Sequence, residues 1–119
     1  MAQILGRAFI HWNGMLLRTK KGSSKAGNIA GMQRNEVIGD AGIDHSEELL
    51  APFVETTVLV TADLNIMELL AAKDAVITFE GDNGKTLVLH EAHQALGGDL
   101  SSDSGELETK WVGSRFEEN

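Results

Sequence analysis

Apolar and polar residues alternate along most of this chain, which is the pattern of half-buried β-strands. The alternating segments are short and are bounded by glycine, asparagine or aspartate. They predict strands at residues 7–12, 15–18, 53–60, 75–79, 86–90 and 106–113. Asn13-Gly14 follows the first segment and Asp82-Asn83-Gly84 follows the fourth, and both predict tight hairpin turns. The pattern therefore indicates a mainly β protein.

One segment departs from this period. In residues 63–73 the apolar positions and a final lysine recur at helical spacing, as Ile66, Leu69, Leu70 and Lys73. Asp63 or Asn65 can cap the start, and Asn65 with Glu68 fits a capping box. We expect one short helix inserted between strands.

Residues 20–51 differ from the rest because their first part is rich in glycine, serine and lysine, which is poor material for a core. Residues 34–38 and 43–47 could pair as a hairpin across residues 39–42. A connection this long inside a small domain usually indicates function or disorder. No composition shift marks a domain boundary, so we expect a single domain over residues 1–119 with a protruding loop or hairpin region at 20–51.

Composition narrows the function. The chain has 119 residues and no cysteine, which excludes disulfides, thiolate metal sites and a cysteine nucleophile. It has no apolar run long enough for a membrane-spanning segment and no signal peptide, so we expect synthesis and folding in the cytoplasm. The net charge of −8 would repel a phosphate backbone and argues against a protein that grips nucleic acid.

No catalytic constellation is evident. His90 and His93 lie three positions apart, not the four of a zinc-protease helix, and on a regular strand they would face opposite sides. The serines lack a nucleophile-elbow setting, and residues 99–105 lack the spacing of a calcium loop. Phosphate-binding loop motifs are also missing. We therefore predict no catalytic residue, no metal and no cofactor, and a protein that is not an enzyme.

Charge segregates along the chain. Lys20, Lys21, Lys25 and Arg34 form a basic stretch, and acids dominate from Glu36 to Glu55. A basic segment beside an acidic surface favours association between copies, although a mobile solvated loop would have the same composition. Trp12 and Trp111 are candidates for core or interface positions, with the core favoured.

The order of these signals over nearly the whole chain resembles the tail tube proteins of Mu-like, contractile-tailed phages. The resemblance is carried by residues 6–10, 34–43, 52–58, 63–64, 76–79, 84–89 and 106–116. No single one of these motifs is diagnostic, and residues 20–30 depart most from the family pattern.

The resemblance implies a small β-barrel or sandwich with one flanking α-helix and a long extended loop or hairpin. It also implies hexameric rings that stack into the tail tube of a virion, with strands of neighbouring subunits joining edge to edge. Region 20–51 would reach the next subunit or ring and order on assembly. The partners implied are other copies of the chain, a sheath, a baseplate or initiator, and a tail terminator.

The same resemblance suggests roles for particular side chains. Acids facing the lumen would let DNA pass without specific binding, and the candidates are Glu36, Asp44 and Glu55, then Glu106 and Glu108. The candidates for contacts between subunits or rings are Lys20, Lys21, Lys25, Asn28, Ile29, Met32 and Arg34.

Two other functions remain open at this point. A tube subunit of a phage-like bacteriocin or a secretion apparatus would have the same subunit physics. A monomeric β-barrel that binds a small ligand would need an apolar interior cavity. The scarcity of aromatic residues and the few strands argue for an interior filled by side chains.

Overall fold

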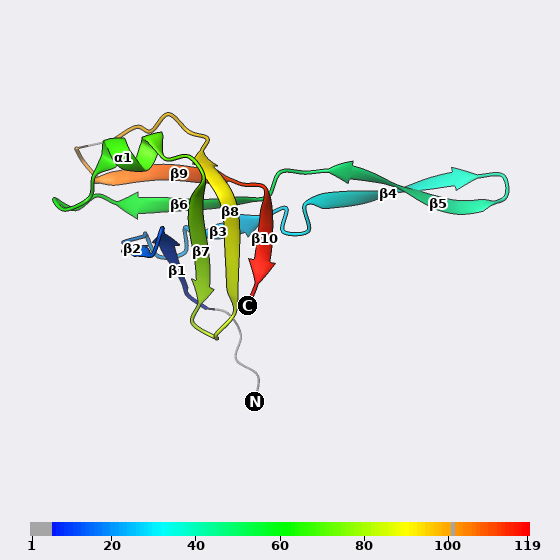
Figure 1. Cartoon of the computed structure of the whole chain (residues 1–119), viewed down its shortest axis with the longest axis horizontal. Coiled ribbons are helices and arrows are strands. Elements are labelled where there is room, and N and C mark those ends of the chain that lie inside the picture. Colours follow the sequence, from blue (N-terminus) through cyan, green and yellow to red (C-terminus); the bar gives the residue numbers. More distant parts are fainter. Residues whose placement is uncertain (1–5, 101) are drawn as a thin grey trace.

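Ten strands and one short helix make up the described part of the computed structural model, which covers residues 6–100 and 102–119 (Figure 1). The elements are β1 (Ala8–Trp12), β2 (Met15–Leu17), β3 (Lys25–Gly27), β4 (Met32–Gly39), β5 (Gly42–Leu49), β6 (Phe53–Leu59), α1 (Ile66–Ala71), β7 (Ala75–Gly81), β8 (Thr86–Gln94), β9 (Glu106–Val112) and β10 (Arg115–Glu118). Every strand pairing is antiparallel.

Two sheets share the bent strand β8 and lie nearly crosswise in Figure 1. The first part of β8 lies between β7 and β10, and β7 continues the sheet to β1 and β2. The end of β8 pairs through His93 and Gln94 with β9, which continues the second sheet to β6 and β3. The chain therefore changes sheet within single strands, as in orthogonally packed β-sandwiches.

A β-bulge makes the corner in β8. The register with β7 shifts between Ala75 and Ile77, and Glu91 in β8 adopts a left-handed φ of 55°. Because the bulge adds one residue, Leu89 and Ala92 are both fully buried although they are three positions apart. The expectation that His90 and His93 face opposite sides is therefore wrong, since the bulge turns both away from the core.

Local sequence explains most of the remaining elements. In β6, buried residues alternate with partly exposed ones over Phe53–Val58, as the β-branched, period-two pattern predicts. The turn between β1 and β2 has φ of 50° at Asn13 and 86° at Gly14. Positive φ at both central residues matches the right-handed twist of a two-residue hairpin, which confirms that turn.

The core lies between the two sheets and is filled by side chains from every long strand of the body. Trp12 and Trp111 stack with ring centroids 6.4 Å apart, and both are buried, which confirms their core assignment. The helix α1 is shorter than the predicted segment. It adds Leu69 to the core, and the Asn65 side chain caps it by accepting a hydrogen bond from the Glu68 N–H at 3.1 Å.

The predicted fold class is confirmed as mainly β, with a sandwich-like sheet and one short helix. The strands do not close into a barrel. An isolated bridge between Thr19 and Val58 links the chain after β2 to β6, and a hydrogen bond from the Lys20 N–H to the Thr57 carbonyl (2.9 Å) lies beside it.

Region 20–51 is largely ordered into strands. The hairpin predicted from residues 34–38 and 43–47 is present and longer, because β4 and β5 pair from Met32 with Leu49 to Gly39 with Gly42. It forms a separate two-stranded sheet that extends away from the body and contributes to a molecule 63 Å long (Figure 1). The short strand β3 was not predicted; it adds an edge to β6.

Candidate assembly surfaces

The β4–β5 hairpin has two different faces, because partners in register share a side and successive pairs alternate. One face carries Met32 with Leu49 at the base, charged pairs in the middle, and Ile38 with Ile43 near the tip. The other face is polar except for Val37, which lies opposite Asp44. The hairpin thus has one face with apolar ends and one acidic, hydrophilic face.

Every residue of β4 and β5 is exposed. Ile38 is 79% exposed, Ile43 70% and Leu49 89%, in a chain whose sandwich buries comparable side chains completely. An isolated two-stranded hairpin is marginally stable in water, and apolar side chains at its tip gain nothing from solvent. The hairpin therefore has the character of a surface that a partner covers.

The predicted contact residues lie in three parts of the structure. Lys20 and Lys21 belong to the body beside β2, whereas Met32 and Arg34 lie in the hairpin. The other three lie between them: Lys25 in β3, an exposed Ile29, and Asn28, which donates a side-chain hydrogen bond to the Ala51 carbonyl at 3.0 Å. The structure thus separates residues that the sequence presents as one basic stretch.

Arg34 has a partner within the hairpin. Its Nε lies 3.6 Å from Oε1 of Glu47, the residue opposite it in register, and His45 Nε2 lies 3.9 Å from the same oxygen. These pairs are exposed, so each adds little stability by itself. They instead set the charge pattern in the middle of the hairpin face.

Three of the five candidate lumen acids share one surface. Glu55, Glu106 and Glu108 alternate with the buried residues of β6 and β9, so they lie on the outer face of the second sheet. Lys110 faces Glu55 at 3.9 Å, and Glu106 pairs with Lys20 at 3.3 Å. This outer face is acidic with interspersed lysines.

Phe53 lies on the same outer face between two ammonium groups. The Nζ of Lys110 is 4.7 Å from its ring centroid and that of Lys25 is 5.9 Å from it. Both distances fall within the range of cation–π attraction. The two lysine side chains are thereby held against the sheet.

The remaining two lumen candidates do not share a side. Glu36 pairs in register with His45 and lies on the face that carries Ile38, whereas Asp44 pairs with Val37 on the other face. The sequence could not show this, because the assignment depends on the register of the hairpin.

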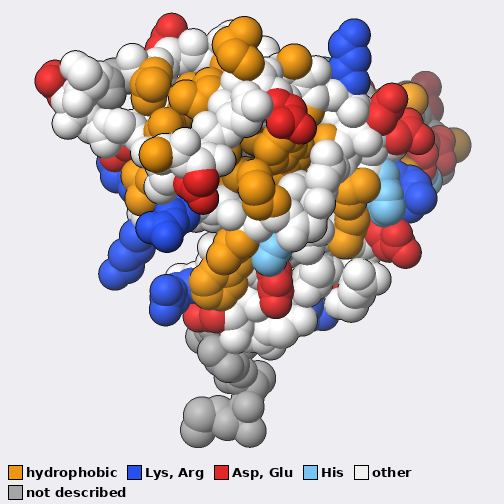
Figure 2. Space-filling view, turned by 60° about the vertical axis from the view of Figure 1, so that its left-hand side comes forward, with side chains coloured by type: hydrophobic (Ala, Val, Ile, Leu, Met, Phe, Trp, Pro, Cys, Tyr) orange, Lys and Arg blue, Asp and Glu red, His pale blue; other side chains and the backbone are white. Residues whose placement is uncertain are grey.

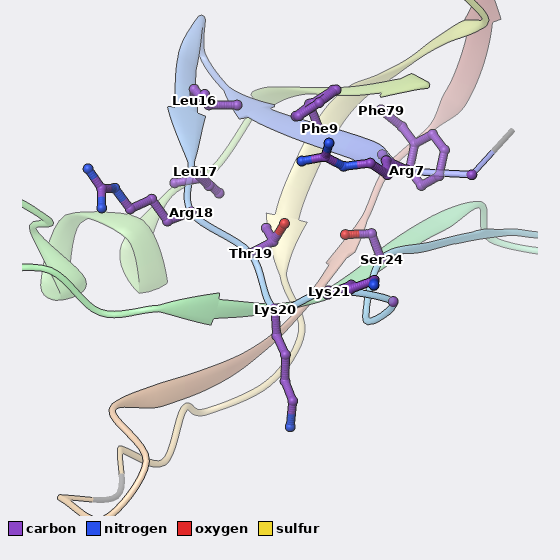
Figure 3. Close-up of a pocket in the computed structure, with 13 residues that line it drawn as sticks. Arg7, Phe9, Leu16, Leu17, Arg18, Thr19, Lys20, Lys21, Ser24 and Phe79 are labelled. Carbon is purple, nitrogen blue, oxygen red and sulfur yellow. The ribbon is translucent and has the colours of Figure 1, made fainter. Parts of the chain in front are cut away.

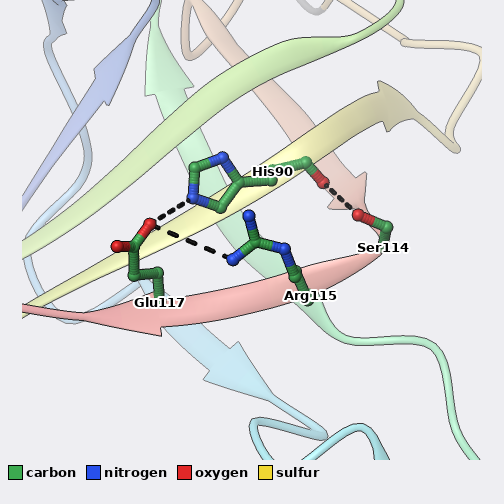
Figure 4. Close-up of polar contacts among 4 residues, drawn as sticks. All are labelled: His90, Ser114, Arg115 and Glu117. Carbon is green, nitrogen blue, oxygen red and sulfur yellow. Dashed lines mark hydrogen bonds and ion pairs between the residues drawn. The ribbon is translucent and has the colours of Figure 1, made fainter.

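β10 is an edge strand that the described residues pair on one side, with β8. Figure 4 shows how it is attached: Glu117 Oε2 lies 2.8 Å from His90 Nε2, and the Ser114 hydroxyl donates to the His90 carbonyl at 3.2 Å. Arg115 lies 4.0 Å from the same Glu117 oxygen. An edge with unpaired backbone groups is suited to pairing with another chain.

Figure 2 shows hydrophobic side chains gathered on the end of the body that carries α1 and β2, with Lys and Arg side chains on both sides of a notch. Exposed apolar residues of these elements and their surroundings include Met15, Leu16, Leu59 and Met67. The sequence pattern did not predict this surface. Its signal was Leu16, which is exposed next to the buried Leu17 at a position where strict alternation calls for a polar residue.

The described residues contain no cluster of histidine, aspartate or glutamate that could hold a metal ion.

Two exposed carboxylates have lowered pKa values. Hydrogen bonds from the backbone N–H groups of Gly6 and Arg7 lower the pKa of Asp82, and a hydrogen bond from the Thr61 side chain lowers that of Asp63. Both contacts hold turns in place. The described part of the chain also contains no helix with the length and apolar character needed to cross a membrane.

A family model described as phage tail tube protein matches residues 1–118. No curated protein sequence matches the chain. Among solved structures, one similar chain comes from the cryo-EM structure of an extracellular contractile injection system, PVC sheath/tube terminator in extended state. The two folds superpose with a TM-score of 0.73 at 11% identity, covering 98% of this chain and 96% of the other. At this identity the likeness concerns the fold alone.

Proposed function

Since the chain belongs to the phage tail tube protein family, we propose that six copies form a ring and that rings stack into a tail tube. The tube is the conduit through which DNA enters the host. The role is structural, and no residue is assigned to catalysis. The protein would act in the tail of the virion, together with a sheath, a baseplate or initiator, and a tail terminator.

The observation that carries the proposal is the β4–β5 hairpin. It extends from a well-packed body, all of its residues are exposed, and large apolar side chains lie near its tip and base. Burying such side chains against a neighbouring subunit would stabilise both the hairpin and the assembly. A monomeric small-ligand-binding protein has no use for this element.

The open edges support the same conclusion. β3 and β10 each pair on one side among the described strands. Exposed edges favour aggregation unless they are covered, and a closed ring of subunits covers them by joining strand to strand. Ring closure would also supply the barrel that the single chain does not close.

We assign the lumen to the outer face of β6 and β9. It carries Glu55, Glu106 and Glu108, and six copies at −8 each would give a ring of about −48 before counterions. A negative wall repels the phosphate backbone, so DNA would slide without sticking. Lys25 and Lys110 on the same face moderate the local charge. Of the hairpin acids, Glu36 and Asp44 cannot both face the channel, because they lie on opposite faces.

Assembly can be tested by negative-stain electron microscopy and sedimentation of the purified protein over a range of concentrations. Replacing Ile38 and Ile43 by threonine keeps β-branched residues but removes roughly four apolar carbons, at about 0.8 kcal/mol each when buried. Because part of each isoleucine side chain is already buried in the single chain, the expected loss of association free energy is about 2 kcal/mol per subunit. The critical concentration for tubes should then rise roughly thirtyfold.

Val76→Thr is the matched control, because it makes the same kind of β-branched exchange at a residue that is 39% exposed but lies on β7 and not in the hairpin. If the double threonine variant forms tubes at the same concentration as the wild-type protein, the hairpin is not the contact between subunits. A wild-type protein that stays at 12.8 kDa under all conditions would favour the ligand-binding alternative.

A second candidate is the tube of a phage-like particle, such as a bacteriocin or secretion apparatus. The fold similarity to a chain from a contractile injection system favours considering it. Genes for heads and DNA packaging beside the gene for this chain would support a phage, and their absence beside other tail genes would support the alternative.

A further inference from the structure

A groove of about 770 Å³ opens on the body where β1, β2 and the chain after β2 converge (Figure 3). Phe9, Leu16, Leu17 and Phe79 give it an apolar lining. Leu16 is 55% exposed, so part of this lining faces solvent in the single chain. The lining residues come from positions 6–9, 16–22, 24 and 79, which only the folded sheet brings together.

The groove is basic in an acidic protein. Arg7, Arg18, Lys20 and Lys21 line it, and none of its thirteen described lining residues is acidic. These are four of the ten lysines and arginines in the chain. In Figure 3 the Arg7 guanidinium lies toward the Phe9 ring, 5.7 Å from its centroid, whereas Lys20 points away.

The cations differ in their availability to a partner. Lys20 is paired with Glu106 at 3.3 Å. Within the described residues, by contrast, neither Arg7 nor Lys21 lies in an ion pair with a carboxylate. The Arg7 charge does act on the nearby carboxylate of Asp82, so Lys21 is the more available of the two. An occupant with both apolar and acidic groups would satisfy the groove, because a simple anion would leave Phe9 and Leu16 exposed.

The tip of the β4–β5 hairpin has this composition. Residues 35–44 contain three acids, Glu36, Asp40 and Asp44, and no lysine or arginine. The same stretch exposes Val37, Ile38 and Ile43, with Asp40 in the two-residue loop at the end.

We propose that the hairpin tip, residues 36–44, of one copy inserts into the groove of a neighbouring copy. This inference rests on the proposed assembly and specifies its contact. The hairpin points away from the body and from β2 in Figure 1, so the tip cannot reach the groove of its own chain. A contact between two different surfaces of identical subunits is heterologous, the type that generates rings when the rotation closes.

A cross-linking experiment tests the contact. The chain has no cysteine, so Asp40→Cys with Lys21→Cys places one thiol at the tip and one in the groove. A short bismaleimide joins thiols without the strict geometry of a disulfide. Assembled protein should give covalent oligomers on a denaturing gel, at least tenfold more than the control pair Asp40→Cys with Lys73→Cys, whose second thiol lies at the end of α1.

The outcomes separate the two levels of the proposal. Rings or tubes that show no more cross-linking than the control would overturn the tip-in-groove contact and leave the tube function standing. Wild-type protein that never forms rings or tubes would overturn both.

A charge-exchange experiment tests the contact between the hairpin tip and the groove independently. Asp40→Lys or Lys21→Glu alone should raise the critical concentration roughly tenfold by placing like charges together. The two changes combined should restore most of the loss, whereas Asp40→Lys with Lys73→Glu should not. A double variant no better than the worse single variant would count against the pairing, provided circular dichroism shows that all variants fold.

Discussion

Gly113 occupies the corner between β9 and β10, where the chain passes from one sheet to the other. A Cβ atom there would lie 2.6 Å from the His90 carbonyl oxygen and 2.6 Å from Cγ and Cδ1 of Leu89. Real Cβ atoms essentially never approach other atoms this closely. The His90 oxygen cannot easily move, because it accepts hydrogen bonds from both the backbone N–H and the hydroxyl of Ser114.

Gly113→Ala should therefore destabilise the body. Overpacking in a filled core costs about 1–3 kcal/mol. An unfolding entropy of about 2.1 cal/mol/K per residue gives roughly 250 cal/mol/K for this chain, so the expected fall in Tm is about 4–12 °C. The strain is steric, since Gly113 is not in the left-handed region of φ.

Gly97→Ala provides the control for this substitution. Gly97 also lies outside the left-handed region, and a Cβ there would meet nothing within 4 Å. Its replacement should be neutral or stabilising by up to about 1 kcal/mol, because alanine reduces the entropy of the unfolded chain. Thermal unfolding of dilute protein, followed by circular dichroism, measures both variants. Equal Tm values for the two would refute the steric account of the corner.

Two further predictions concern charge. Replacing Glu55 and Glu108 by lysine should slow DNA ejection while leaving tubes intact under the microscope, because the lumen would attract phosphate. Glu91→Lys, at the bulge of β8, is the control. Unchanged ejection by the Glu55 and Glu108 variant would contradict the assignment of the lumen to this face. The pKa of Asp82 is lowered in the fold by the Gly6 N–H, so its stabilising contribution is present above the unfolded pKa near 3.8 and is lost as pH falls below that value. Asp82→Asn should accordingly lose less Tm than the wild type between pH 5 and pH 3, and parallel losses would contradict this.

Local physics explains what the sequence determined. The Asn13-Gly14 turn needs positive φ at two successive residues, and this pair adopts it readily, so sequence alone located the first hairpin. The period-two pattern of residues 53–60 likewise reports a strand with one buried face wherever that strand lies. Asn65 capped the helix as expected, because capping depends on residues only three positions apart.

Pairing between strands that are distant in the sequence decided the features that local sequence could not predict. β3 was missed because Lys25–Gly27 has no hydrophobic pattern, and its strand state comes from the open edge of β6. The bulge at Glu91 put His90 and His93 on the same side, where a regular strand would put them on opposite sides, since one added residue reverses every side chain that follows.

The candidate surfaces depend on tertiary structure in the same way. The hairpin register placed Glu36 and Asp44 on opposite faces, while β6 and β9 brought Glu55 and Glu108 onto one. The groove joins Phe9 to Phe79 across 70 positions of sequence. Residue spacing determines which face of one element is apolar. Which elements become neighbours depends on how the apolar faces of all of them pack into one core. The sequence therefore determined the strands, turns and helix, and only the tertiary structure decided which side chains could act together.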